Sequence, residues 1–399
     1  MLRFLTAGES HGPSLTAILD GIPAGLSLPE QIIDRELERR QKGYGSGGRM
    51  KIENDSVKIL GGVMEEKTTG APIALQVLNI DHIKWKGKEI EPFTTPRPGH
   101  ADLTGTLKYG YSDLRPALER ASARETTMRV AVGAVCKHLL MQFGIVVGGY
   151  VRSIGEVDSD PGEMPYLERF ERAELSDVRC PQQEAAGRMR ARIEETIHNK
   201  DTLGGILEIV ALGVPAGLGS YSQWDSRLEA RLALALMSVQ AIKGVEVGDA
   251  FENSRLPGTK AHDSIRLSST MNEQRQDIKD TYLVRETNHA GGIEGGVTNG
   301  QPIVMRVAMK PIATTLTPQM TVNLATGQES MTQYERSDFC PVPRAVPILE
   351  AMVAFVLSEA LIQKLGGDSI NEMKPRFEKL RKTRLEDLIM DNTTHLWWE

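Results

Sequence analysis

The chain has 399 residues, of which 40% are hydrophobic and 25% charged, and its formal net charge is −6. This length allows one large domain or two to three ordinary ones with a substantial core, and the negative charge argues against general binding to nucleic acid or membrane surfaces. The three cysteines, Cys136, Cys180 and Cys340, form no disulfide framework and no C-x-x-C pair, which favours a reducing cytoplasm.

The first distinctive stretch, T-A-G-E-S-H-G, spans residues 6–12 after a short apolar run. Two glycines bracket a carboxylate, a hydroxyl and an imidazole, so the backbone beside three proton-handling groups can bend. Ser10 and His11 could act as a nucleophile and its base, but adjacent residues on a strand point to opposite faces. His11 could also be structural, in a turn, or a proton donor in a pocket. The stretch alone leaves these interpretations open.

A helix is expected over residues 29–41, and the loop K-G-Y-G-S-G-G-R-M follows it. Arg39, Arg40 and Arg49 lie around this glycine-rich loop. Guanidinium groups bind phosphates and carboxylates through paired hydrogen bonds, so the loop is a candidate anion site. Residues 78–95 are polar and lysine-rich, and we expect them to form an inserted loop.

The motif R-P-G-H-A-D, residues 97–102, fixes a turn just before His100. Asp102 could orient the imidazole for catalysis, and the alternative is that His100 caps a helix. The other histidines show no metal-ligand spacing such as H-E-x-x-H, so we expect no metal site.

The best-marked helix start is S-x-x-E, formed by Ser122 and Glu125. This pattern predicts a capping box, and the apolar residues that follow fall on one face of a helix. The positive end of that helix suits an anion, and Arg120 and Arg124 lie beside it.

The second half contains a charged insertion at residues 158–200, with an exposed helix over 183–198, and a further helix over 226–242. The stretch N-H-A-G-G-I-E-G-G-V-T-N-G-Q-P precedes K-P-I-A-T-T and matches neither a P-loop nor a dinucleotide-binding turn. Its glycines would let the backbone approach a flat or phosphorylated ligand closely, although a pair of tight strand turns would also explain them.

Near the C-terminus, R-S-D-F-C-P-V-P-R-A-V-P places Arg336 and Arg344 around Asp338. Asp338 could form a structural ion pair with Arg336. The apolar segment 345–362 is interrupted by two glutamates, which predicts a buried helix rather than a membrane span. The arginines of the chain lie among Gly, Ser and Pro rather than on polar helical stripes, which favours a ligand with several negative charges.

The two halves echo one another. G-I-P-A-G-L at residues 21–26 recurs as G-V-P-A-G-L at 213–218, and each is followed by a helical stretch and Lys-Gly. G-G-V-M-E-E-K-T-T-G-A-P-I is echoed later by G-G-V-T-N-G-Q-P-I. Three echoes in the same order predict a pseudo-twofold α+β fold with half-repeats at about 1–150 and 200–366, followed by a partly helical tail over 367–399.

Taken together, these motifs resemble the chorismate synthase family over most of the chain. The resemblance implies a single domain with a β-α-β sandwich fold, a homotetramer, and anti 1,4-elimination of phosphate from 5-enolpyruvylshikimate 3-phosphate, a step of the shikimate pathway. Family members require reduced FMN, although the reaction is redox-neutral. The substrate carries two carboxylates and a phosphate, which agrees with the arginines noted above.

The resemblance also implies roles for individual residues. His11 would donate a proton to the reduced flavin, His100 would protonate or hold the leaving phosphate, and Asp338 would act near flavin N5. The substrate would contact Ser10, Arg40, Arg49, Arg124 and Arg336. FMN would contact Arg120, Ala121, Ser122, Gln240, Ala241, Gly295, Lys310, Pro311, Ile312, Ala313, Thr314 and Arg336.

One position departs from the family pattern. Family members usually have arginine where this chain has Ser46, and that arginine is associated with phosphate or NADPH contact. The departure puts an NADPH site at Arg40 and Ser46 in doubt, and a separate flavin reductase could supply the reduced cofactor. Two other interpretations are a serine hydrolase that uses Ser10 and a non-catalytic protein that binds phosphorylated metabolites.

Overall fold

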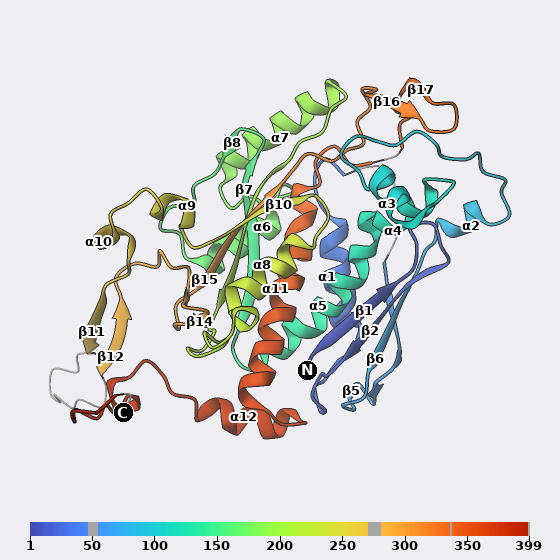
Figure 1. The fold of residues 1–399 in the computed structure, drawn as a ribbon. Coiled ribbons are helices and arrows are strands. Elements are labelled where there is room, and N and C mark those ends of the chain that lie inside the picture. Colours follow the sequence, from blue (N-terminus) through green and yellow to red (C-terminus); the bar gives the residue numbers. More distant parts are fainter. Residues whose placement is uncertain (47–54, 270–280, 336, 398–399) are drawn as a thin grey trace.

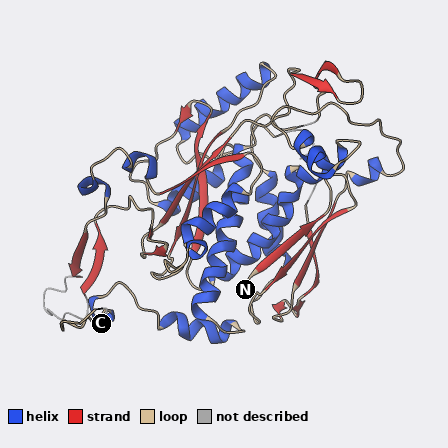
Figure 2. Ribbon diagram, viewed as in Figure 1, coloured by secondary structure: helices blue, strands red, loops and turns tan. Residues whose placement is uncertain are grey.

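The computed structural model describes residues 1–46, 55–269, 281–335 and 337–397. Two large antiparallel sheets lie on either side of a layer of helices (Figure 1, Figure 2). The first sheet has the strand order β1-β2-β6-β3, and the second has the order β10-β15-β9-β7-β8. The α+β class expected from the sequence is confirmed.

The elements have the following bounds. The first sheet consists of β1 (Arg3–Ala7), β2 (Ser14–Asp20), β3 (Val57–Gly61) and β6 (Ile73–Leu78). The second consists of β7 (Val146–Ile154), β8 (Val157–Asp158), β9 (Gly205–Leu212), β10 (Ile242–Val247) and β15 (Ile303–Met309). The helices of the middle layer are α1 (Glu30–Gln41), α5 (Thr126–Met141), α8 (Leu228–Met237) and α11 (Val342–Leu365).

The remaining helices are α2 (His82–Trp85), α3 (Asp102–Tyr109), α4 (Arg115–Ala121), α6 (Tyr166–Leu175), α7 (Gln183–His198), α9 (Ala250–Asn253), α10 (Gly258–Ala261) and α12 (Ile370–Glu378). The short strands pair as β4 (Val63–Met64) with β5 (Lys67–Thr68), β11 (Ile265–Ser269) with β12 (Thr281–Arg285), β13 (Ile293–Glu294) with β14 (Val297–Thr298), and β16 (Met320–Asn323) with β17 (Gln328–Met331).

The core lies between the sheets and includes residues of both. Leu15, Ala17 and Leu19 alternate along β2 and are buried, because one face of the sheet packs on the helices. Helix α11 is long and apolar enough to cross a membrane by length and composition, but most of it is buried here. It packs on α5, α8 and the second sheet, which explains why nearly all of its faces are apolar.

Helices α5 and α11 cross at very short range. A Cβ at Gly133 would lie 2.1 Å from Cβ of Ala351, so only glycine allows this contact. Glu350 of α11 is fully buried and bonds to Arg39 at 2.7 Å and Lys137 at 2.8 Å. The two cations offset the cost of removing this carboxylate from water and join α11 to α1 and α5.

The echoed segments occupy equivalent places in the two halves. In each half the chain forms two strands, a helix, two more strands and a helix, with the same order of pairing. Leu26 N donates to Thr68 Oγ1, and Leu218 N donates to Thr298 Oγ1, both at 2.9 Å. Strand β7 is the first strand of the second sheet in chain order, and it pairs with β9.

Several expected elements are present, but the helix expected over 226–242 ends at Met237, because β10 begins at Ile242, and one helix start is misplaced. Helices α7 and α11 lie where the sequence predicts them, and the tail contains α12. The helix predicted to start at Ser122 begins instead at Thr126. The Ser122 hydroxyl caps a short 3₁₀ turn by accepting from Arg124 N. The Glu125 side chain does not complete the capping box, because its carboxylate accepts hydrogen bonds from Thr6 and Arg129 instead.

Candidate active site

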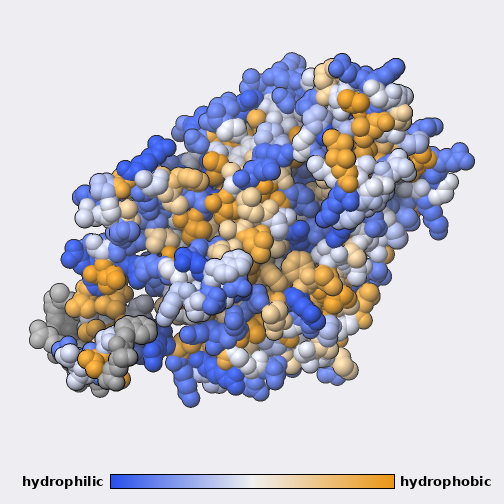
Figure 3. Space-filling model, viewed as in Figure 1, coloured by the Kyte–Doolittle hydropathy of each residue, from blue (hydrophilic) through white to orange (hydrophobic). Residues whose placement is uncertain are grey.

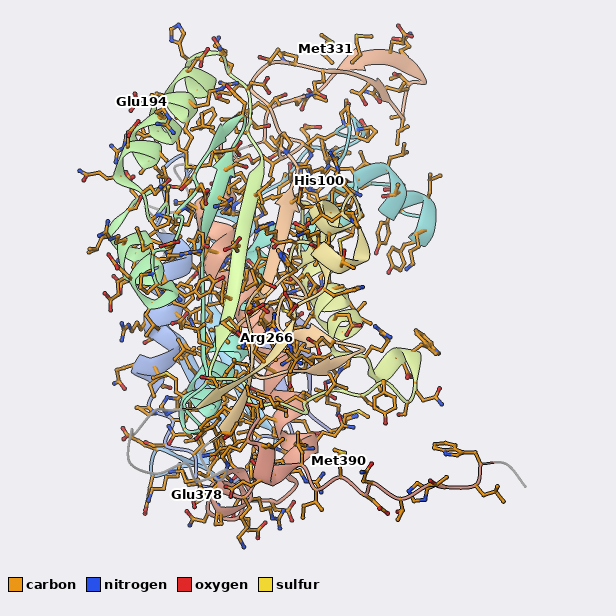
Figure 4. All side chains as sticks on the ribbon, turned by 90° about the vertical axis from the view of Figure 1, so that its left-hand side faces the viewer. His100, Glu194, Arg266, Met331, Glu378 and Met390 are labelled. Carbon is orange, nitrogen blue, oxygen red and sulfur yellow. The ribbon has the colours of Figure 1, made fainter. Side chains whose placement is uncertain are left out.

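A cavity of about 890 Å³ collects most of the residues singled out in the sequence. Its walls come from the turn after β1, from α2, from the junction of α4 and α5, and from loops of the second half. Figure 4 shows His100 in the upper part of the molecule, far from Glu378 and Met390. The predicted residues that line the cavity are Ser10, His11, Arg40, His100, Ala121, Ser122, Arg124, Gln240, Ala241, Lys310, Ile312, Ala313, Thr314 and Asp338.

His11 lies in a turn that follows β1, not on a strand, so the strand argument against pairing with Ser10 is wrong in its premise. Its backbone N donates to Glu119 Oε2 at 2.8 Å, and its ring Nδ1 lies 2.7 Å from Glu119 Oε1. Ser10 Oγ instead accepts a hydrogen bond from Ser122 Oγ at 3.2 Å. Burial would raise the pKa of Glu119, but its hydrogen bonds with His11 outweigh this effect and lower the pKa.

His100 is held by the two other charged residues of its motif. Its Nδ1 lies 2.6 Å from Asp102 Oδ1, as expected, and Arg97 Nε donates to Asp102 Oδ2 at 2.8 Å. The Asp102 side chain is fully buried. Burial would raise the pKa of Asp102, but the hydrogen bonds from His100 and Arg97 outweigh it and lower the pKa well below its ordinary value. Arg97 also donates to Thr314 at 2.9 Å, which ties the motif to the second half.

Asp55 connects two buried arginines of the cavity. Its Oδ1 accepts from Arg124 at 2.6 Å, and its Oδ2 accepts from Arg40 at 3.3 Å. Burial lowers the pKa of Arg40; Asp55 opposes this effect, whereas the guanidinium groups of Arg344 and Arg124 add to it. The two neighbouring cations therefore destabilise the charge of Arg40, and an anionic ligand in the cavity would relieve that repulsion.

Asp338 pairs with Arg344, and both line the cavity. The ion pair considered from the sequence was with Arg336, which lies outside the described residues. Arg344 also donates from Nε to the backbone oxygen of Arg40 at 3.2 Å. The pair therefore connects the start of α11 to the end of α1.

Another part of the cavity wall contains K-P-I-A-T and Gln240-Ala241. Lys310 Nζ donates to Gly99 O at 2.7 Å, and Lys310 N donates to Ala241 O at 2.9 Å. Ala241 has a φ of 66°, in the left-handed region, so the turn before β10 is strained for alanine. Gln240 donates to Glu125 at 3.3 Å. This wall combines small apolar side chains with one lysine.

Some predicted residues are not at the cavity. The exposed Arg120 donates to Thr6 O and Gly8 O, and Pro311 is exposed. Gly295 lies in the turn between β13 and β14 and does not line the cavity, and neither does Ser46. Arg49 and Arg336 lie outside the described residues.

The structure also adds residues that sequence reasoning missed. Residues 78–95, interpreted as an inserted loop, contribute Lys84, Trp85 and Lys88 to the cavity wall. Within this segment, His82–Trp85 form the short helix α2. Glu119 and Asp55 were also missed, and only the sequence E-R-A-S-A-R, which contains Glu119, offered a signal.

The arrangement suits acid–base chemistry on an anionic ligand. Two histidines each have a carboxylate on Nδ1, which orients the ring beside the cavity as a proton-exchanging group. Arginines on one wall and small apolar residues on the other suit a ligand with charged and flat parts. Within the described ranges, no group of three or more His, Cys, Asp or Glu side chains could hold a metal ion.

Comparison with known proteins gives matches over nearly the whole chain. A family model described as chorismate synthase matches residues 2–362. A chorismate synthase of Trichlorobacter lovleyi is 50% identical over 383 residues, which cover 94% of this chain and 97% of that protein. One of Aquifex aeolicus is 50% identical over 396 residues, with 94% and 96% coverage. A crystal structure of a chorismate synthase superimposes with a TM-score of 0.76 at 44% identity and covers 94% of this chain and 96% of its own.

Proposed function

The chain belongs to the chorismate synthase family, and from this premise we propose a role for each part of the cavity. The enzyme is a carbon–oxygen lyase of the shikimate pathway. It removes phosphate from 5-enolpyruvylshikimate 3-phosphate and forms chorismate. The C6–H and C3–O bonds break, the phosphate leaves with the C3–O electron pair, and the C6–H pair forms part of the new diene.

The substrate phosphate and carboxylates would bind the arginine wall. Arg40 and Arg124 are buried, preorganised by Asp55, and mutually repulsive, which supports their use as an anion site. Ser10, in the turn after β1, accepts a hydrogen bond from Ser122, two residues before Arg124. Arg49 and Arg336 are proposed as further contacts on the family resemblance alone.

Reduced FMN is the proposed cofactor, and the cavity fits it. A volume of about 890 Å³ can take a flavin nucleotide together with a small substrate. Small apolar side chains and one lysine suit a flat ring system with a phosphate. Reduced FMN, when bound, would supply electron density to the allylic system and recover it, without net redox change. The proposed contacts that line the cavity are Ala121, Ser122, Gln240, Ala241, Lys310, Ile312, Ala313 and Thr314.

Three residues of the chain would move or hold protons. His11, oriented by Glu119, would donate a proton toward the cofactor from Nε2. His100, oriented by Asp102, would protonate or hold the leaving phosphate. Asp338 would accept or relay the C6 proton. The observation that carries the proposal is that His11, His100 and Asp338, far apart in the sequence, line one cavity together with the arginine wall.

Three further family properties are proposed: the oligomeric state, the cellular location and the source of the reduced flavin. A homotetramer is supported by exposed apolar side chains, such as Leu107, Tyr109 and Met320. Figure 3 shows an apolar area at the upper right, where α3, β16 and β17 lie in Figure 1. A cytoplasmic location is supported by the unpaired Cys136, Cys180 and Cys340. The flavin would be reduced either by NADPH bound at Arg40 and Ser46 or by a separate reductase.

We also infer that the two halves arose by duplication within a β-α-β sandwich. Both halves have the same strand order, and the hydrogen bonds of Thr68 and Thr298 are equivalent. Thr68 Oγ1 also donates to Pro23 O, and Thr298 Oγ1 donates to Pro215 O. The segment 158–200, which contains α6 and α7, would be an insertion in the second half.

Anaerobic turnover with chemically reduced FMN tests the function. The proposal predicts equal amounts of chorismate and phosphate from 5-enolpyruvylshikimate 3-phosphate, with and without NADPH. A serine hydrolase would instead be labelled at Ser10 by a fluorophosphonate. A non-catalytic binding protein would bind the substrate and release neither product.

A further inference from the structure

Trp85 lies directly against the imidazole of His11. The two ring centroids are 4.4 Å apart and the ring planes meet at 41°. Trp85 is partly buried and lines the cavity, as does His11. A contact this close fixes the tilt of the smaller ring, because aromatic surfaces exclude other rotamers of their neighbour.

The same short helix also contacts the backbone of His11. Helix α2 begins at His82, whose Nδ1 lies 2.9 Å from His11 O and donates to it. His82 and Trp85 are three residues apart, so both lie on one face of the helical turn. Helix α2 therefore contacts His11 at two points, one on the backbone and one on the ring.

Glu119 holds His11 from another direction. Its carboxylate accepts from the backbone N and faces ring Nδ1, at 2.8 and 2.7 Å. The carboxylate holds the Nδ1 edge of the ring, on the side of α4. The Trp85 ring adds a second contact to the imidazole, a tilted aromatic pair with centroids 4.4 Å apart.

We propose that Trp85 is a positioning residue for His11: it sets the plane of the imidazole and thereby the direction in which Nε2 meets the bound ligand. The proposal rests on the proposed function of His11. It predicts an effect on the catalysed step and not on substrate affinity. If Trp85 were only structural, it would anchor residues 78–95 and position Lys84 and Lys88, which also line the cavity. Loss of the Trp85 side chain would then weaken substrate binding.

The test is a double-mutant cycle with single-turnover kinetics at saturating reduced FMN. The variants are Trp85→Ala, Trp85→Phe, His11→Ala and the double variant Trp85→Ala/His11→Ala. Trp224→Ala is the matched control, because Trp224 is 80% exposed on the surface and does not line the cavity. FMN affinity and the substrate KM are measured for each variant.

Trp85→Ala should lower kcat about tenfold or more, the scale of a misplaced catalytic group, with the substrate KM nearly unchanged. Trp85→Phe should recover most of the loss, since a phenyl face can also pack on the imidazole. In the His11→Ala background the Trp85→Ala change should add nothing, because the residue on which it acts is absent. Trp224→Ala should match the parent.

Two results would overturn the proposal. One is a Trp85→Ala variant with a raised KM and an unchanged kcat. The other is that Trp85→Ala lowers kcat by the same factor in the parent and in the His11→Ala background. A parent enzyme that fails to release chorismate would contradict the proposed function itself, before any variant is compared. A His11→Ala variant as active as the parent would remove the role of His11 and the positioning role with it.

Discussion

Arg344 pairs with Asp338 at the wall of the cavity, and the same arginine donates to the backbone of Arg40 at 3.2 Å. Both side chains of the pair are mostly buried, with 12% and 17% of their surface exposed. A carboxylate held in this way can act as a structural ion pair or as a proton relay. The two roles give different kinetic results.

Asp338→Asn should lower turnover by about 10²–10⁴, the range typical of a positioned acid or base, while folding and FMN affinity are retained. Deuterium at C6 of the substrate should give a larger isotope effect than in the parent, because breaking the C6–H bond becomes slower. An Asp338→Asn protein with weak FMN binding, yet a normal rate and isotope effect at saturating FMN, would show that the ion pair is only structural.

Asp55→Asn should destabilise the protein, because it leaves two buried guanidinium groups without their shared carboxylate. Removing one partner of a buried ion pair typically costs about 3–5 kcal/mol in the free energy of unfolding. Urea unfolding measures the loss, and saturating inorganic phosphate should restore more stability in the variant than in the parent. The control is Asp20→Asn, whose partner Arg3 is 75% exposed, with an expected change of about 0–1 kcal/mol. Equal effects of the two changes would contradict the role of Asp55.

Ser46→Arg should tighten binding of NADPH or of the substrate, since a charge-assisted hydrogen bond contributes about 1.5–3 kcal/mol. Michaelis constants for both ligands measure the change. If Ser46→Arg changes little, Arg49 compensates for the usual arginine, and Arg49→Ala should then raise the Michaelis constant. Unchanged constants in both variants would exclude a contact with either ligand at this loop.

Stability should fall in acid through Glu350. Burial would raise its pKa, but Arg39 and Lys137 outweigh burial and lower the pKa from 4.5 to about 2. The unfolded state therefore binds more protons between these values, so the stabilisation is complete above about 4.5 and is lost as pH falls toward 2. Urea unfolding of Glu350→Gln should show a flatter slope in this range than the parent. Glu184→Gln, at a side chain that is 90% exposed, is the control. Equal slopes in the parent and Glu350→Gln would contradict the assignment.

Local patterns predicted much of the fold. Helix α7 has the predicted bounds, because its buried residues recur at helical spacing within one segment. Helix α11 was predicted to be buried because two glutamates interrupt its apolar run. In the structure, one of them, Glu350, pairs with Arg39 and Lys137. The start at Ser122 was wrong because Glu125, which the capping box would use, bonds instead to Thr6, which is distant in the sequence.

The candidate site was predictable only in part, because residues that are distant in the sequence complete it. Glycine- and proline-rich motifs mark the turns that hold His11 and His100, because those turns depend on local backbone geometry. The partner of His11, Glu119, comes from more than a hundred residues away and is set by packing of α4 on the turn after β1. Trp85 was missed because a lysine-rich segment is usually solvated, and nothing local shows that this one packs on the cavity.

The most direct test of the central claim, that this cavity catalyses the elimination, is an anaerobic single turnover with reduced FMN in the parent and in His100→Ala. The parent should release chorismate and phosphate in equal amounts. His100→Ala should still bind FMN but react about 10²–10⁴ times more slowly, as expected for loss of a positioned acid. A parent that releases neither product, or a His100→Ala variant that reacts at the parent's rate, would contradict the claim.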